Sequence, residues 1–424
     1  MKAQHAAVGI DDGAPTERAL AQIDPVPRVS IQAFCESSDI AAVISAAISD
    51  RRMAKAHVKQ NMGGAPAAVE AYKSAPTPNV IVIEAPASRD ALLGQLEELA
   101  EYCDAGTKVV VLGKLNDIVL YRQLIARGVS EYLVAPFGVV DFIQAISQLF
   151  SVPGTKPLGR VIAVVGAKGG VGASTVAHNL AWSLASVTEM ATIIADFDLA
   201  FGTAGLDYNQ DPPQGVAEAV FAPDRVDAVL VDRLLSKCGD KLSLLAAPAT
   251  LDRVLDFAEV SFDSLIDAMR ASTPWIVLDV PHLWSGWARR ILVSADDVIV
   301  VASPDLANLR NTKNLIDNVK GARLNDAPPR LVLNGVGMLK RPEIAAAEFA
   351  KAVETDPIAI VPHDAKLFGG AANNGQMIAE IEPNGKTAHV FVDLASTLAG
   401  RTDTRKPKRG VLEPLIAKLG RKKK

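Results

Sequence analysis

A glycine-rich loop at residues 166–175 constrains the fold of this chain more than any other feature. The loop reads Gly-Ala-Lys-Gly-Gly-Val-Gly-Ala-Ser-Thr and follows a short apolar, β-branched run at residues 161–165. Residues 176–185 after it have the apolar spacing of a helix. A strand, a glycine-rich turn and a helix in this order form a phosphate-binding loop, in which backbone N–H groups face an anion. The sequence therefore predicts a parallel α/β domain with a phosphate site.

The loop itself supplies most of the expected nucleotide contacts. Its glycines let the backbone approach a phosphate without a Cβ atom in the way, and the hydroxyl of Ser174 suits Mg²⁺. The lysine that usually precedes this hydroxyl is missing, because Ala173 occupies its position and Lys168 stands at the front of the loop instead. The expected contacts are Lys168, Gly169, Gly170, Val171, Gly172, Ala173, Ser174 and Thr175.

Polar side chains also end three later apolar runs. Asp196 and Asp198 end the first, Asp279 the second and Asn334 the third. One aspartate at a strand end is more often a helix cap or a loop residue, but three such ends in order with a phosphate loop indicate a site. The carboxylates predict a metal site formed by Ser174, Asp196 and Asp279. The amide of Asn334 is suited to the edge of a base.

Three motifs within residues 160–395 resemble the MinD/ParA ATPases: Lys168-Gly-Gly-Val-Gly-Ala-Ser-Thr, Asp196-Phe-Asp198 and Val277-Leu-Asp279. They are similar to the deviant Walker A, switch I and Walker B of that family. The resemblance implies ATP and Mg²⁺ as cofactors and a homodimer in which Lys168 reaches the partner's phosphates. It also implies that Asp198 positions the attacking water, that Asp279 holds the metal through water and that Asn334 contacts adenine.

The sequence departs from this family at Ala173, where the family has a second lysine, and at Ala167, where most members have glycine. Losing one charge-assisted phosphate contact costs roughly 1.5–3 kcal/mol of binding free energy. The loss is larger in the transition state, where charge on the γ-phosphate has to be stabilised. We therefore expect ATP binding with slow or absent hydrolysis.

The N-terminal part, residues 28–150, alternates five strands and five helices and resembles a response-regulator receiver domain of flavodoxin-like order. Glu84 stands at the position of the phosphate-accepting aspartate, and Glu36 alone remains of the acidic pair. Gly113 replaces the usual hydroxyl residue and Ala135 the usual lysine. We expect no phosphorylation and a role in docking or dimerisation, with an unrelated flavodoxin-like domain as the alternative.

The predicted fold class is therefore α/β with two doubly wound domains. The N-terminal strands are expected at 29–34, 57–60, 79–84, 108–112 and 131–134. The C-terminal strands are expected at 161–165, 192–195, 242–245, 275–278, 297–301 and 330–333. The expected boundaries are a disordered N-terminus at 1–27, the receiver-like domain at 28–150, a linker at 151–159, the nucleotide-binding domain at 160–399 and a basic tail at 400–424.

The order of these domains, together with the run Asp198-Leu-Ala-Phe-Gly-Thr-Ala-Gly-Leu-Asp207, resembles the CpaE/TadZ pilus-assembly proteins. The resemblance implies a polar localisation factor for the tight-adherence (Flp type IV) pilus secretion machine, with pilus secretion-machine proteins as partners. The alternatives are a ParA-like partition ATPase that binds DNA non-specifically, and a non-enzymatic scaffold. A phosphotransfer regulator fits least, because Glu84 is no ordinary acceptor.

The charge of −4 is distributed unevenly, since residues 401–424 contain ten basic and two acidic residues. Within this tail, residues 411–419 carry an apolar helical stripe that resembles a membrane-binding amphipathic helix. We expect peripheral membrane contact through residues 411–424, with protein docking, DNA contact or a loose end as alternatives. The chain has no spanning apolar run, no secretory signal, and three cysteines without metal or disulfide spacing. It is therefore expected in the cytoplasm, near the inner membrane and pole, without a nucleic-acid partner.

Overall fold

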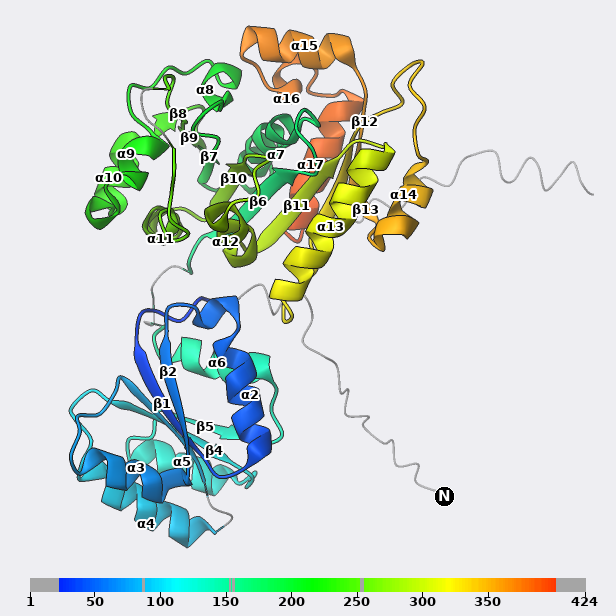
Figure 1. The fold of residues 1–424 in the computed structure, drawn as a ribbon. Coiled ribbons are helices and arrows are strands. Elements are labelled where there is room, and N and C mark those ends of the chain that lie inside the picture. The colour runs from blue at the N-terminus through cyan, green and yellow to red at the C-terminus, as the bar shows by residue number, and fades with distance from the viewer. Residues whose placement is uncertain (1–22, 86–87, 152–153, 155–156, 252–254, 402–424) are drawn as a thin grey trace, which may run out of the picture.

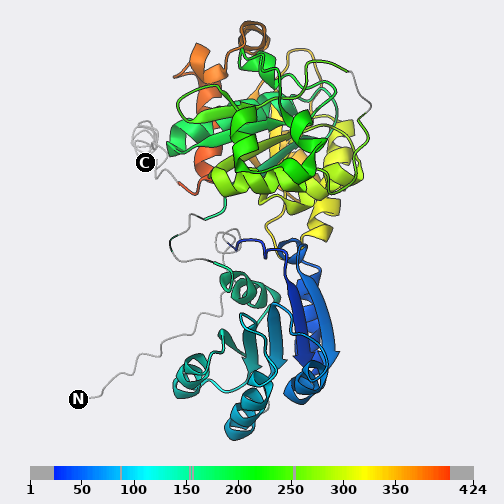
Figure 2. The same ribbon diagram turned by 90° about the vertical axis from the view of Figure 1, so that its left-hand side faces the viewer.

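The computed structural model describes residues 23–85, 88–151, 154, 157–251 and 255–401. They form two α/β domains, each built around its own mostly parallel sheet (Figures 1 and 2). The predicted tail helix at 411–424 lies outside the described residues, as do residues 1–22. None of the described helices has the length and hydropathy that a membrane crossing requires.

The N-terminal domain has a five-stranded parallel sheet in the order β2-β1-β3-β4-β5, which confirms the predicted flavodoxin-like order. Its β3 is a continuous Val-Ile-Val-Ile run, because helices cover both faces of the sheet and leave no solvent-facing side. The strands are β1 Ser30–Cys35, β2 His57–Met62, β3 Val80–Glu84, β4 Lys108–Gly113 and β5 Glu131–Val134. The helices are α2 Ser38–Ile48, η1 Arg51–Met53, α3 Gly64–Tyr72, α4 Arg89–Ala100, α5 Ile118–Ala126 and α6 Val139–Gln148.

Residues 23–27, which the sequence analysis assigns to the disordered N-terminus, pack against this domain. Val26 is fully buried in its core, and the Val26 N–H donates to the Arg52 carbonyl at 2.8 Å. Burial of the apolar Val26 side chain therefore places the start of this domain a few residues before the predicted boundary at residue 28.

The C-terminal domain has an eight-stranded sheet in the order β13-β12-β11-β6-β10-β7-β9-β8, in which only β8 is antiparallel. All six predicted strands are present. The strands are β6 Arg160–Gly166, β7 Thr192–Asp196, β8 Ser236–Lys237, β9 Leu242–Leu245, β10 Trp275–Val280, β11 Asp297–Ala302, β12 Arg330–Val336 and β13 Pro357–Pro362. The two edge strands, β8 and β13, are not among the predicted strands. β13 begins and ends with proline, a residue tolerated at edges.

Helices cover both faces of this sheet, and the central strands β6, β10 and β11 are buried almost throughout. The long helix α7 (Ala173–Thr188) follows β6 and packs against α17 (Lys386–Leu398). The others are α8 Ala204–Asp207, α9 Val216–Val220, η2 Pro223–Arg225, α10 Ala228–Leu234, α11 Asp263–Ser272, α12 Gly286–Ser294, α13 Leu306–Ala322, α14 Ala346–Val353, α15 Ala365–Asn374 and α16 Ile378–Ile381.

The two domains meet through η1 of the smaller domain (Figures 1 and 2). Arg51 contacts Asp296, just before β11, and Asp326, before β12. Arg52 also contacts Asp326. These aspartates precede parallel strands, so the N-terminal domain docks at the edge opposite the phosphate loop. The carboxyl edge of the large sheet is left to the candidate site.

Candidate nucleotide site

The phosphate loop connects β6 to α7, as the sequence predicts. Gly170 and Gly172 have φ angles of +78° and +81°, a left-handed conformation that glycine adopts readily. At Gly172 glycine is also needed for space, because a Cβ atom there would lie 2.5 Å from the Asn334 Nδ2 atom. The loop sequence therefore fixes a turn that directs backbone N–H groups toward a common anion position.

Three side chains from elsewhere in the domain hold this loop. Asn334, at the carboxyl end of β12, donates from Nδ2 to the Val171 carbonyl at 2.7 Å. Asn311 on α13 donates from Nδ2 to the Ala167 carbonyl at 3.0 Å. His282, after β10, contacts the carbonyl of the last β6 residue through Nδ1 at 2.8 Å. The loop is thus preorganised by the fold alone.

Sequence reasoning missed Asn311 and His282 because each is a single polar residue more than 110 positions from its partner. The amide nitrogen of Asn334 already donates to the loop. Asn334 could therefore contact adenine only through its amide oxygen, or after its side chain changes conformation. The adenine contact stays a prediction.

Asp196 and Asp279 end adjacent parallel strands and are direct register partners. Both are buried, with 0% and 3% of their surface exposed. The Asp196 carboxylate accepts the Asp198 N–H at 3.1 Å and the Ala204 N–H at 3.0 Å, which shapes the loop after β7. Burial and the neighbouring Asp279 charge raise the pKa of Asp196 to about 7.

His178 on α7 completes this acidic cluster, and sequence reasoning missed it. It is fully buried, with Nδ1 2.7 Å from Asp207 Oδ2 and Nε2 3.4 Å from Asp279 Oδ2. Burial opposes its positive charge, but the contacts with Asp207 and Asp279 outweigh that cost and raise its pKa to about 10. One available signal was its position four residues after Ser174, on the same helix face.

These residues fit a divalent cation. The ligating atoms of His178, Asp196 and Asp279 all lie within 4.8 Å of one another. Ser174, in the first turn of α7, adds a hydroxyl from the loop side. Carboxylate and hydroxyl oxygens are the ligands that Mg²⁺ prefers. The buried Nε2 of His178 lacks a hydrogen-bond partner of good geometry, so a buried polar atom beside the two carboxylates is left unsatisfied.

The remaining predicted residues, Lys168, Asp198 and Ala173, do not point at the cluster of carboxylates. Lys168 is exposed at the front of the loop. Asp198 uses its carboxylate to accept the Phe201 N–H at 3.0 Å, within its own loop. Ala173 packs against the apolar core cluster that includes Val164 and Val301. The phosphate loop therefore carries one lysine, and it points outward.

The receiver-like domain has no open phosphate site at Glu84. Its buried carboxylate accepts hydrogen bonds from the Glu36 N–H at 2.6 Å, the Ser37 N–H at 2.8 Å and the Ser37 hydroxyl at 2.7 Å. A Cβ atom at Gly113 would lie 2.2 Å from the Tyr132 hydroxyl, so Tyr132 fills the space beside that position. Glu84 thus acts as a cap for the start of α2.

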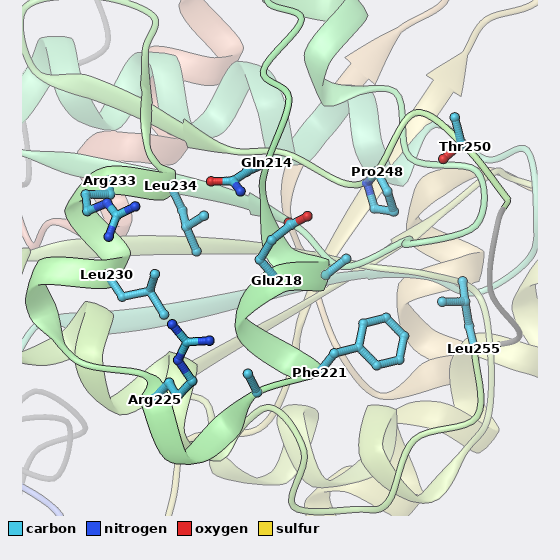
Figure 3. A pocket seen from close by; sticks show the side chains of 12 residues that line it. Gln214, Glu218, Phe221, Arg225, Leu230, Arg233, Leu234, Pro248, Thr250 and Leu255 are labelled. Carbon is cyan, nitrogen blue, oxygen red and sulfur yellow. The ribbon is translucent and has the colours of Figure 1, made fainter.

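A separate hollow of about 530 Å³ is lined by residues of α9 and α10 (Figure 3). Phe221, Leu230 and Leu255 form apolar walls, and the side chains of Arg225 and Arg233 stand at its edge. None of its lining residues belongs to the phosphate loop or to the acidic cluster.

Comparisons with known proteins show which families this chain resembles. A family model described as an AAA domain matches residues 159–329. The septum site-determining protein MinD of Helicobacter pylori is 29% identical over 235 residues, covering 51% of this chain and 83% of the relative. The crystal structure of the pilus assembly protein CpaE from Caulobacter crescentus is 45% identical, covering 30% of this chain and 98% of that one, with a TM-score of 0.30.

A third comparison is with the septum site-determining protein MinD of Pyrococcus horikoshii, solved as a complex with Mg-ADP. It is 22% identical, covers 58% of this chain and all of that one, and has a TM-score of 0.51. This likeness shows the fold of the C-terminal domain.

Proposed function

Since the chain belongs to the CpaE pilus assembly proteins and carries a MinD/ParA-type ATPase domain, we propose that it is an ATP-binding spatial organiser. It dimerises on nucleotide, hydrolyses ATP slowly or not at all, and localises the tight-adherence (Flp type IV) pilus secretion machine at the cell pole. The observation that carries this proposal is a preorganised phosphate loop with one outward-facing lysine, Lys168, and alanine at position 173.

ATP and Mg²⁺ are the proposed ligands. The backbone of residues 168–175 binds the phosphates, and Ser174 with Asp279 and Asp196 holds the cation. The cation neutralises phosphate charge when bound. The buried carboxylates orient toward it from adjacent strands, and Asn334 keeps the loop in place.

Slow hydrolysis follows from Ala173. No positive side chain at that position contacts the γ-phosphate within the same subunit, and the alanine methyl group packs into the core. Developing charge in the transition state is then stabilised only by backbone N–H groups, the cation and a lysine from a partner. Such a protein binds nucleotide long enough to act as a switch.

Dimerisation through the nucleotide face is supported by exposed apolar side chains on the segments around the phosphate loop. They follow four different strands at the carboxyl edge of the sheet. They are Phe201 at 75% exposure, Trp284 at 54%, Leu306 at 73% and Leu339 at 90%. Exposed apolar residues gathered at one edge typically mark an interaction surface. In the proposed dimer they surround two nucleotides, and each Lys168 reaches the partner's phosphates.

Sedimentation velocity tests this proposal. With Mg·ATP the protein is expected to shift from monomer to dimer, and with Mg·ADP to remain monomeric. Trp284→Ala removes a large aromatic side chain from the face and is expected to weaken the dimer by roughly 10-fold or more. Val229→Ala, on exposed α10, is the matched control with no expected effect. A monomer under all conditions contradicts nucleotide-driven dimerisation and favours the non-enzymatic scaffold.

Membrane attachment belongs to the same proposal and rests on the sequence of residues 411–424. A dimer presents two such segments, which increases binding through avidity. Flotation with anionic vesicles is expected for the full chain with Mg·ATP and not for a chain ending at residue 401. Equal flotation of both proteins contradicts this attachment.

A further inference from the structure

His178 occupies the first turns of α7, one helical turn below Ser174. Residues four apart on a helix lie on the same face, so His178 and Ser174 share one face of α7, the helix that packs against β10. Ser174 faces the loop, whereas His178 is fully buried. A buried imidazole is costly unless its nitrogens have polar partners, and here each nitrogen faces a different aspartate.

The two partners belong to different parts of the site. Nδ1 lies 2.7 Å from Asp207, the last residue of α8, at the distance of a strong hydrogen bond. Nε2 lies 3.4 Å from Asp279 at the end of β10. The imidazole therefore connects Asp279, a candidate cation ligand, to Asp207, which ends α8. This helix lies in the segment after the Asp196–Asp198 motif.

The ring orientation is fixed from a second direction. The Tyr208 hydroxyl donates to the His178 backbone carbonyl at 2.7 Å, and the two rings lie 5.7 Å apart. Asp207 and Tyr208 are consecutive, so one short segment holds both the backbone and Nδ1 of His178. Carboxylate–imidazole pairs of this kind orient the groups that surround metal ions in proteins.

We propose that His178 is a positioning residue for the cation site. It holds Asp279 in the orientation that the nucleotide-bound cation requires, and it connects that carboxylate to Asp207 at the end of α8. The same segment exposes Phe201 and Leu206, at 75% and 72%. When a cation binds and shifts the Asp279 carboxylate, His178 passes this shift to Asp207. It thereby reaches the exposed side chains of Phe201 and Leu206 beside the nucleotide face. This inference rests on the proposed ATP-dependent function.

Two near-isosteric variants test it. The amide nitrogen of asparagine takes the place of Nδ1, and that of glutamine takes the place of Nε2. His178→Asn thus keeps the Asp207 contact and loses Asp279, whereas His178→Gln does the reverse. Binding of a non-hydrolysable ATP analogue is measured by calorimetry in Mg²⁺ and again in EDTA. The ratio of the two affinities reports how well the site couples cation to nucleotide.

The expected result is asymmetric. His178→Asn lowers the Mg²⁺-dependent gain in affinity by about 10-fold or more, whereas His178→Gln keeps it within about threefold of the unaltered protein. Affinity in EDTA stays within about twofold in both variants, because backbone N–H groups of the loop make those contacts. A purely structural role for His178 destabilises the fold in both variants and produces no such difference.

Controls separate the possible failures. His363→Asn, at an exposed histidine after β13, is expected to change nothing. If His178→Asn does not fold, Asp207→Ala is the second variant; it removes the same contact as His178→Gln, so its Mg²⁺-dependent gain is expected to stay within the same threefold, and a larger loss overturns the inference. Equal effects of His178→Asn and His178→Gln, or no effect of either, overturn this inference alone. Absence of binding by the unaltered protein overturns the proposed function as well.

Discussion

Arg51 and Asp326 form a bidentate ion pair that joins the two domains across 275 positions of sequence. Arg51 Nε lies 2.7 Å from Asp326 Oδ2, and Arg51 Nη2 lies 3.2 Å from Asp326 Oδ1. Both side chains are at most 5% exposed, and Arg51 also contacts Asp296. This pairing fixes the receiver-like domain to the edge of the large sheet opposite the phosphate loop.

The pair predicts the effect of removing Arg51. Arg51→Ala leaves Asp296 and Asp326 buried with less compensating charge, which costs about 3–5 kcal/mol of docking free energy. We expect the domains to separate while each stays folded, seen as a larger radius of gyration in small-angle scattering and faster cleavage near residues 151–159. Arg89→Ala, which removes a partly exposed pair with Asp117, is the control. An unchanged radius for Arg51→Ala contradicts the proposed contribution of this pair.

The same contact predicts an acid-dependent change. Burial opposes ionisation of Asp296 and Asp326, but nearby arginines, Arg270 and Arg51 first among them, hold both pKa values below the usual 3.8. A lowered folded-state pKa stabilises the docked form above about pH 4, and that contribution is lost as pH falls further. Scattering between pH 6 and pH 3 is expected to show domain separation only at the acidic end. Separation that begins near neutral pH is the contrary result.

Ala173 predicts a gain of function. Ala173→Lys supplies the missing phosphate contact, worth roughly 1.5–3 kcal/mol, or about 10- to 100-fold in ATP affinity. Turnover is expected to rise further, because charge in the transition state is also stabilised. Ala173→Met provides a side chain of similar length without charge and should raise neither quantity. Phosphate release and calorimetry measure the two effects. If lysine and methionine behave alike, the role assigned to this position is wrong.

Glu84 predicts a structural effect in the N-terminal domain. Glu84→Ala leaves the Glu36 and Ser37 N–H groups without their acceptor, at a cost of about 2–4 kcal/mol in unfolding free energy. Glu84→Gln keeps one oxygen and should cost about 1 kcal/mol. Glu70→Ala, on an exposed surface of α3, is the control. Chemical denaturation measures these differences. Incorporation of phosphate from acetyl phosphate at Glu84 would contradict the closed site.

The sequence predicted the architecture well because the deciding signals are local. Buried parallel strands appear as β-branched runs, and the loop at 166–175 carries its turn and its helix start within ten residues. The edge strand β13 was missed because its apolar run is only four residues long and is bounded by prolines. Edge strands are half solvated, so composition marks them weakly.

The sequence indicated the candidate site through the phosphate loop and through polar residues at strand ends. Asp196 and Asp279 become neighbours because parallel strands end at one edge. His178, His282 and Asn311 depend on tertiary contacts between distant segments. The four-residue spacing from Ser174 was a weak signal for His178, whereas His282 and Asn311 are single polar residues without such a pattern. The docking pair of Arg51 and Asp326 was missed for the same reason.

Calorimetric titration with Mg·ATP, for the unaltered protein and for Lys168→Ala, tests the central claim most directly. The account predicts saturable binding in the unaltered protein and weaker binding in the variant, since Lys168 is the only lysine of the loop. Circular dichroism on both proteins controls for folding. Absence of saturable binding by the intact, folded protein would contradict a nucleotide-controlled organiser and leave the fold as a scaffold.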